Sequence, residues 1–156
     1  MQNDYFIEKR RLPVQIELTS GERLEGEIFI QSSWRGPAML EDAPEYLNSS
    51  EPFFPLQALG GTRLIARRQV VLLKAPPPDF NRDESLLGVP AVVSLCLSTG
   101  TVVQGTLYIE ARAPNLRVLD FLNCATDPFL TLHDRAGDVL VNRAHILSVV
   151  EPDGAD

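Results

Sequence analysis

The stretch VQIELTSGERLEGEIFI, residues 14–30, is written a second time as VSLCLSTGTVVQGTLYI, residues 93–109. The two copies share a valine, a leucine, two glycines and an isoleucine at the same five places. In each copy apolar and polar residues alternate before the first glycine, as Val14, Ile16 and Leu18 do before Gly21. A period of two is typical of a half-buried β-strand. The repeat therefore predicts two similar β-hairpins.

Each copy places its two glycines where β-structure uses them. Gly21 and Gly100 fall in the expected turns, where glycine takes a positive φ without steric cost. Gly26 and Gly105 fall inside the second strand of each hairpin. Glycine inside a strand usually marks a bulge, a bend or a close backbone approach. We therefore predict strongly bent strands, as a very small barrel requires.

The similarity extends beyond the hairpins. Residues 46–56 are echoed by residues 121–132, and residues 64–73 match residues 140–149. Both members of the second pair are rich in strand-forming residues and carry a polar break in the middle. A tandem duplication explains this agreement.

The duplication predicts how the chain is divided. The first module covers residues 1–74 and contains a loop over residues 31–45. Residues 75–88 form a proline-rich linker, stiffened by the run Pro76-Pro77-Pro78, and its residues 81–88 are expected to hold one short helical turn. The second module covers residues 89–151, and residues 152–156 form an acidic tail.

Charge argues against a nucleic-acid partner. The formal net charge is -7, of which residues 1–80 carry -2 (nine Lys/Arg, eleven Asp/Glu) and residues 81–156 carry -5 (five against ten). Binding to phosphates depends on basic groups that displace counterions. A local basic patch could still offset the acidic body.

Compartment follows from the apolar runs and the cysteines. No apolar run approaches the roughly 18 residues that a membrane span needs, and the first residues show no secretory signal. We therefore expect a cytoplasmic protein with no membrane partner. Cys96 and Cys124 have no spacing typical of a zinc site or a disulfide framework, which favours small apolar residues kept reduced.

Each half resembles the Sm and Sm-like (LSm) domain. The residues that match the first motif of that family are Val14, Ile16, Leu18, Gly21, Gly26 and Ile28, and again Val93, Leu95, Leu97, Gly100, Gly105 and Leu107. The apolar spacing of its second motif survives in Ile65, Val70 and Leu73 and in Val141, Ile146 and Val149. The resemblance implies an all-β protein of two tandem, strongly bent, five-stranded SH3-like barrels.

The resemblance also implies candidate RNA contacts. In RNA-binding members an Asn of the first motif and an Arg of the second hold a base, which points to Asn48 and Asn123 and to Arg67 and Arg143. Both arginines are shifted by one residue, because Ala66-Arg67 and Asn142-Arg143 replace the Arg-Gly pair of the family. In a strand this shift would turn them to the other face.

Other surface residues have two readings. Arg67 and Arg68 belong to the best basic cluster, with Arg63 and Lys74, but a solvated strand face explains these residues equally well. Trp34 is either a contact for a partner or a cover over the barrel core. Stacking aromatics, which single-strand binders usually need, are scarce.

We expect no catalytic site, cofactor or bound metal. The histidines are His133 and His145, and His133-Asp134 reads as part of a hairpin turn. A metal site built from His133, Asp134, Asp138 and Cys124 matches no known spacing.

The sequence therefore favours a non-enzymatic interaction or scaffold module. Small barrels keep open edge strands, which native proteins must cover or pair, and Sm-like domains pair edge to edge into rings. Self-association or a protein partner bound through strand addition is the leading hypothesis. RNA binding through the barrel loops is the alternative.

Overall fold

The structure, a computed structural model, describes residues 9–31, 43–77, 88–110 and 117–152, and this part of the chain is all-β. The first half contributes β1 (Lys9–Leu18), β2 (Arg23–Gln31), β3 (Phe53–Ala58), β4 (Gly61–Ala66) and β5 (Val70–Ala75). The second half contributes β6 (Val89–Leu97), β7 (Val102–Ile109), β8 (Phe129–Asp134), β9 (Gly137–Asn142) and β10 (Ile146–Val150). The expected all-β class is confirmed.

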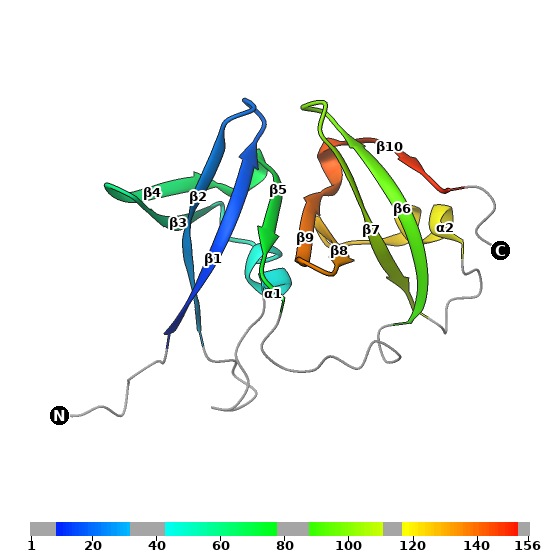
Figure 1. Ribbon diagram of the computed structural model, residues 1–156, viewed down its shortest axis with the longest axis horizontal. Coiled ribbons are helices and arrows are strands. Elements are labelled where there is room, and N and C mark those ends of the chain that lie inside the picture. The colour runs from blue at the N-terminus through cyan, green and yellow to red at the C-terminus, as the bar shows by residue number, and fades with distance from the viewer. Residues whose placement is uncertain (1–8, 32–42, 78–87, 111–116, 153–156) are drawn as a thin grey trace.

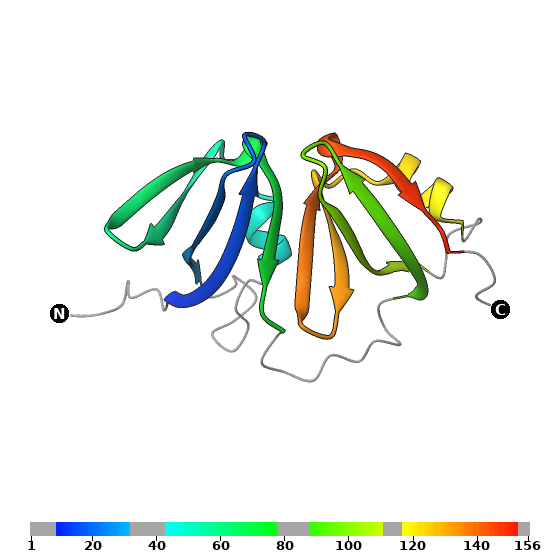
Figure 2. The ribbon, with the colours of Figure 1, turned by 45° about the horizontal axis from the view of Figure 1, so that its top comes forward.

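All ten strands belong to one antiparallel sheet in the order β10-β6-β7-β8-β9-β5-β1-β2-β3-β4. The strand order inside each half is the same, and β5 and β9 lie side by side where the halves meet (Figure 1). Among the described residues no ladder joins β4 to β5 or β9 to β10, so the sheet is not closed. It ends at β4 and β10, which lie at opposite ends of the molecule (Figure 2).

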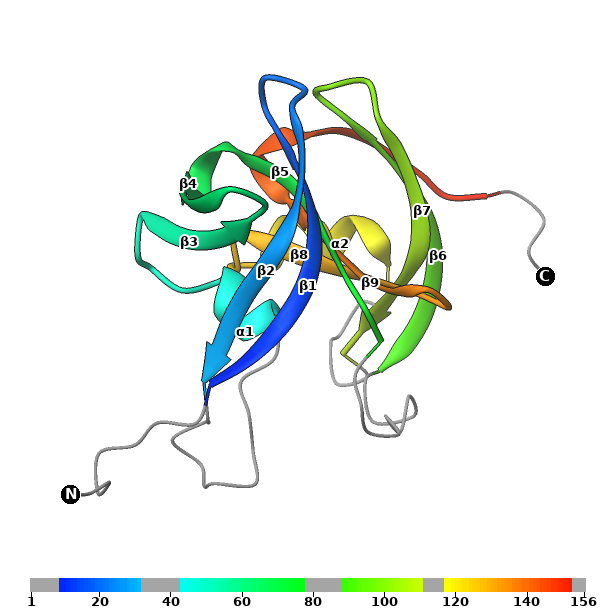
Figure 3. The same ribbon diagram turned by 60° about the vertical axis from the view of Figure 1, so that its left-hand side comes forward.

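Each half is sharply bent next to its strand glycine. β2 pairs with β3 at a single position, Glu27 opposite Gln57, and the β6–β7 hairpin is visibly curved (Figure 3). A Cβ atom on Gly26 would lie 2.6 Å from the Gln57 carbonyl oxygen, and one on Gly105 would lie 3.0 Å from the Leu132 Cβ. At Gly26 the next strand therefore passes too close for a larger residue, and at Gly105 a larger residue would be tightly packed against it.

Short helices interrupt the strand pattern. The helix α1 (Ala43–Leu47) precedes β3 and α2 (Val118–Cys124) precedes β8. The prediction of a loop up to residue 45 is wrong at its end, because Ala43 and Leu47 are buried and draw this segment onto the core. The polar breaks form 3₁₀ turns, η1 (Arg67–Gln69) and η3 (Arg143–His145). In the described part of the chain no helix has the length and apolar character needed to cross a bilayer.

The core consists of two apolar clusters, and each takes residues from both halves. The cluster built mainly by the first half includes Phe129 and Leu140. The cluster built mainly by the second half includes Val71 and Leu72. Burial of apolar surface is the main stabilising term in folding, so the junction between the halves is part of the core.

Candidate functional site

The junction of the two halves, which we call the internal interface, is the antiparallel pairing of β5 with β9. Leu72 lies opposite Val141, Leu73 opposite Leu140, Lys74 opposite Val139 and Ala75 opposite Asp138. Gly137 begins β9 with a φ of 138°. A Cβ atom there would lie 2.1 Å from the Ala75 carbonyl oxygen. The ladder thus brings the two backbones together more tightly than any side chain would allow.

A buried carboxylate lies beside this ladder. Glu17 of β1 is 5% exposed. Its carboxylate accepts hydrogen bonds from the hydroxyls of Thr99 and Thr101, the latter at 2.9 Å. The Arg23 guanidinium lies 3.6 Å away. Hydrogen bonds to an ionised group are stronger than neutral ones, so the β6–β7 turn is held firmly against the first half.

Two asparagines also join the halves. The Asn142 side chain donates to the Val70 carbonyl at 2.9 Å. The Asn48 Oδ1 atom, just after α1, accepts from the Phe129 backbone N–H at 2.9 Å. Because these amides satisfy backbone groups of the opposite half, they tie the junction to one register.

Both ends of the sheet expose apolar residues at positions whose duplicates are buried in the internal interface. Phe53 of β3, Leu64 of β4 and Leu147 of β10 are 58%, 71% and 71% exposed. The duplication aligns them with Phe129, Leu140 and Val71, which are 3%, 0% and 0% exposed. These are the residues through which the clusters cross the internal interface. We call the strands β4 and β10 the open edges.

Among the described residues, no strand pairs with the outer side of β4 either. Pro55 of β3 lies opposite Leu64 and has no N–H to donate. Opposed residues in an antiparallel ladder exchange two hydrogen bonds or none. The Leu64 N–H and C=O therefore point away from β3, toward the open edge. A strand that docks there meets both hydrogen-bonding groups and an exposed apolar side chain.

The arginine that the resemblance assigns to RNA in the first half is occupied within the fold. Arg67 is buried, and its guanidinium donates to the carbonyls of Glu51, Tyr46 and Leu47 at 2.6, 3.0 and 3.2 Å. It also lies over the Phe54 ring, 5.0 Å from the centroid. Arg67 begins η1 and is not part of a strand, so the expected reversal of face does not apply.

Its counterpart in the second half is held less firmly. Arg143 is half-buried and donates to the carbonyls of Asp127 and Leu122 at 3.2 and 3.4 Å. The remaining candidates are dispersed. Asn123 is exposed on α2, Arg68 is exposed on η1, and Trp34 lies outside the described residues.

We expect Arg67→Met to lower the free energy of unfolding by about 3 kcal/mol, since a hydrogen bond to a charged group contributes roughly 1.5–3 kcal/mol and buried carbonyls would lose their donor. Arg143→Met, with fewer and longer bonds, should lower it by only about 1 kcal/mol. Urea denaturation followed by circular dichroism measures both. Equal losses would contradict a special structural role for Arg67.

His133, one of the two histidine candidates, contacts a carboxylate. His133 Nδ1 lies 3.1 Å from Asp138 Oδ1, and the aligned pair in the first half is Gln57 with Thr62, hydrogen-bonded at 2.9 Å. The same contact thus recurs without an ionisable group. Within residues 9–31, 43–77, 88–110 and 117–152, no three His, Cys, Asp or Glu side chains gather to hold a metal ion.

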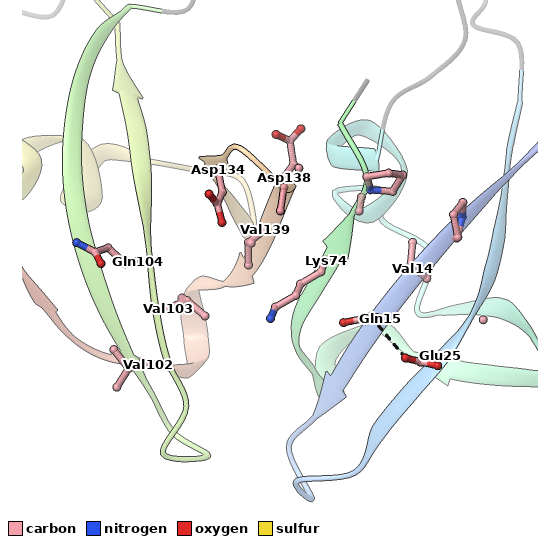
Figure 4. A pocket seen from close by; sticks show the side chains of 16 residues that line it. Val14, Gln15, Glu25, Lys74, Val102, Val103, Gln104, Asp134, Asp138 and Val139 are labelled. Carbon is pink, nitrogen blue, oxygen red and sulfur yellow. Dashed lines mark hydrogen bonds between the residues drawn. The ribbon is translucent and has the colours of Figure 1, made fainter. Parts of the chain in front are cut away.

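An open cleft of about 750 Å³ lies between the two halves. Figure 4 shows Lys74 extending from β5 into it, with Gln15 and Glu25 on one wall and Val103 and Gln104 on the other. Lys74 is the cation among its lining residues, which include Glu25, Asp134 and Asp138. The lining of the cleft therefore carries charges of both signs.

None of the protein-family models, curated proteins or solved structures compared with this chain matches it. The geometry of the chain itself therefore carries the functional argument. Sequence reasoning found the repeat but did not single out Phe53, Leu64 and Leu147. A comparison of the two copies does not identify these three residues as exposed, because the aligned residues are apolar in both.

Proposed function

We propose that this protein is a non-enzymatic assembly module, built from two divergent Sm-like halves, that binds further copies of itself through its open edges. One observation carries the proposal: Leu64 and Leu147 are 71% exposed at positions whose duplicates, Leu140 and Val71, are fully buried in the internal interface. Exposed apolar residues along an unpaired strand favour pairing with another chain.

The internal interface supplies the pattern for this pairing. β4 is the duplicate of β9, and β10 is the duplicate of β5. When β10 of one copy docks on β4 of the next, Val149 comes opposite Leu64, as Leu73 lies opposite Leu140 within the chain. Such a head-to-tail contact leaves one edge free at each end, so it builds a closed ring or a filament.

RNA binding is the weaker hypothesis. Asn48 and Arg67, the first-half residues that the resemblance assigns to a base, already bond to Phe129 and to backbone carbonyls. A base would have to displace those contacts. The acidic net charge of -7 opposes a phosphate backbone as well.

The test is the concentration dependence of the molar mass, measured by light scattering. We expect the wild-type chain to form species larger than a monomer. Leu64→Lys should weaken association at least tenfold, because the new ammonium group would have to be buried without a partner.

Leu59→Lys is the matched control. Leu59 is fully exposed in the β3–β4 turn, and its duplicate, Arg135, stays exposed beside the internal interface. This variant should associate like the wild type. A wild-type chain that remains monomeric at all concentrations, or equal effects of the two substitutions, would refute the proposal.

A further inference from the structure

The contact that flanks the internal interface has no equivalent at the open edges. Inside the chain, the Glu17 carboxylate accepts hydrogen bonds from Thr99 and Thr101 of the second half. The duplication aligns Glu17 with Cys96 of β6. A thiol is a weak hydrogen-bond donor and acceptor. The acceptor that anchors the internal interface is therefore missing on the β10 side.

The donors are replaced as well. Thr99 and Thr101 align with Ser20 and Glu22 in the β1–β2 turn. Glu22 is bound by Arg63 of β4, with Nη1 and Nη2 at 2.9 and 3.2 Å from its carboxylate oxygens. These hydrogen bonds hold the pKa of Glu22 below its ordinary value, so the turn presents a carboxylate where Thr101 presents a hydroxyl.

We infer that in the assembly Cys96 of one copy lies against the turn Ser20–Glu22 of the next copy. Because of this pair of surfaces, the contact between copies dissociates more readily than the internal interface. The inference rests on the proposed function and specifies its interface. The internal interface has two hydroxyls that donate to one carboxylate, whereas the contact between copies sets a thiol against a serine and a glutamate.

The inferred contact also fixes how neighbouring copies are oriented. Cys96 meets the Ser20–Glu22 turn only if β10 docks on β4 as β5 docks on β9. A symmetric contact, β4 on β4 or β10 on β10, would place each surface against itself. The residues at positions 20, 22 and 96 therefore report on how the copies are oriented.

To test this, the residues of the internal interface are introduced at the contact between copies. The triple variant Ser20→Thr, Glu22→Thr, Cys96→Glu supplies two hydroxyls and one carboxylate across the contact. We expect at least about a tenfold tighter association, because one hydrogen bond to a charged group is worth roughly that factor. Sedimentation velocity over a concentration series measures the change.

Two controls complete the cycle. The variant Ser20→Thr, Glu22→Thr keeps the thiol, and Cys96→Glu alone sets its carboxylate against Glu22. Neither should gain as much as the triple variant. If wild type associates and the triple variant is no tighter than both controls, the inferred contact is wrong while the proposed function stands. If the wild type does not associate, the proposed function fails first.

A covalent trap gives an independent readout if the triple variant folds poorly. Glu22→Cys is introduced together with Cys124→Ser, which removes the exposed second thiol. Mild oxidation should link position 22 of one copy to Cys96 of the next, as peptide mapping can show. Links only between two positions 22, or none in an associated sample, would overturn the inference.

Discussion

An equimolar mixture of the Leu64→Lys and Leu147→Lys variants should form a one-to-one complex and stop there, whereas each variant alone stays monomeric. The first variant has a blocked β4 and an intact β10, and the second has the reverse. If β10 docks on β4, the mixture contains one compatible pair of edges. Both substituted positions are 71% exposed, so the monomers should fold normally.

Native mass spectrometry of the mixture, with one variant labelled by ¹⁵N, measures this. Mixing either variant with the Leu59→Lys control should instead give capped chains of several lengths, because the control keeps both edges. A homodimer formed by either variant alone would show that the contact is symmetric. Continued growth of the mixture beyond two copies would show that these strands are not the binding edges.

Gly137→Ala should destabilise the protein far more than Gly61→Ala. The two glycines begin β9 and β4 with φ values of 138° and 142°, so alanine brings the same backbone strain to both, roughly 1–3 kcal/mol. They differ in what a Cβ would meet: the Ala75 carbonyl oxygen at 2.1 Å for Gly137, and nothing within 4 Å for Gly61.

The difference between the two variants thus isolates the internal interface. We expect Gly137→Ala to separate β5 from β9 and to lower the melting temperature by at least about 10 °C more than Gly61→Ala, since 1 kcal/mol shifts it by roughly 2–4 °C in a chain of this size. Differential scanning calorimetry of dilute samples, in which copies do not associate, gives both values. Equal shifts would mean that the close approach contributes nothing to stability.

Much of this architecture could be predicted from the repeat. Alternation around residues 14–18 and 93–97 gives the strands, because a period of two sets one face inward. The short helices were missed, since Ala43–Leu47 and Val118–Cys124 are too short for a helical period to appear. Their position depends on contacts with distant residues, such as the carbonyls of Tyr46 and Leu47 bound by Arg67.

The candidate site was harder to predict than the fold. Leu64 and Leu140 look alike in the sequence, and only the pairing of β5 with β9 shows that one is covered and the other exposed. Sequence pattern therefore cannot say which duplicate of an apolar residue lies at an edge. The same holds for Glu17, whose burial depends on two threonines more than 80 residues away.

The pairing of β5 with β9 also restricts how many modules a larger assembly can contain. Each chain brings two modules already joined in one polarity, so every added copy raises the module count by two. A closed ring of such chains has an even number of modules, and first and second halves alternate around it. Neighbouring positions on its circumference then present different loops, which gives the particle half the rotational symmetry of its backbone.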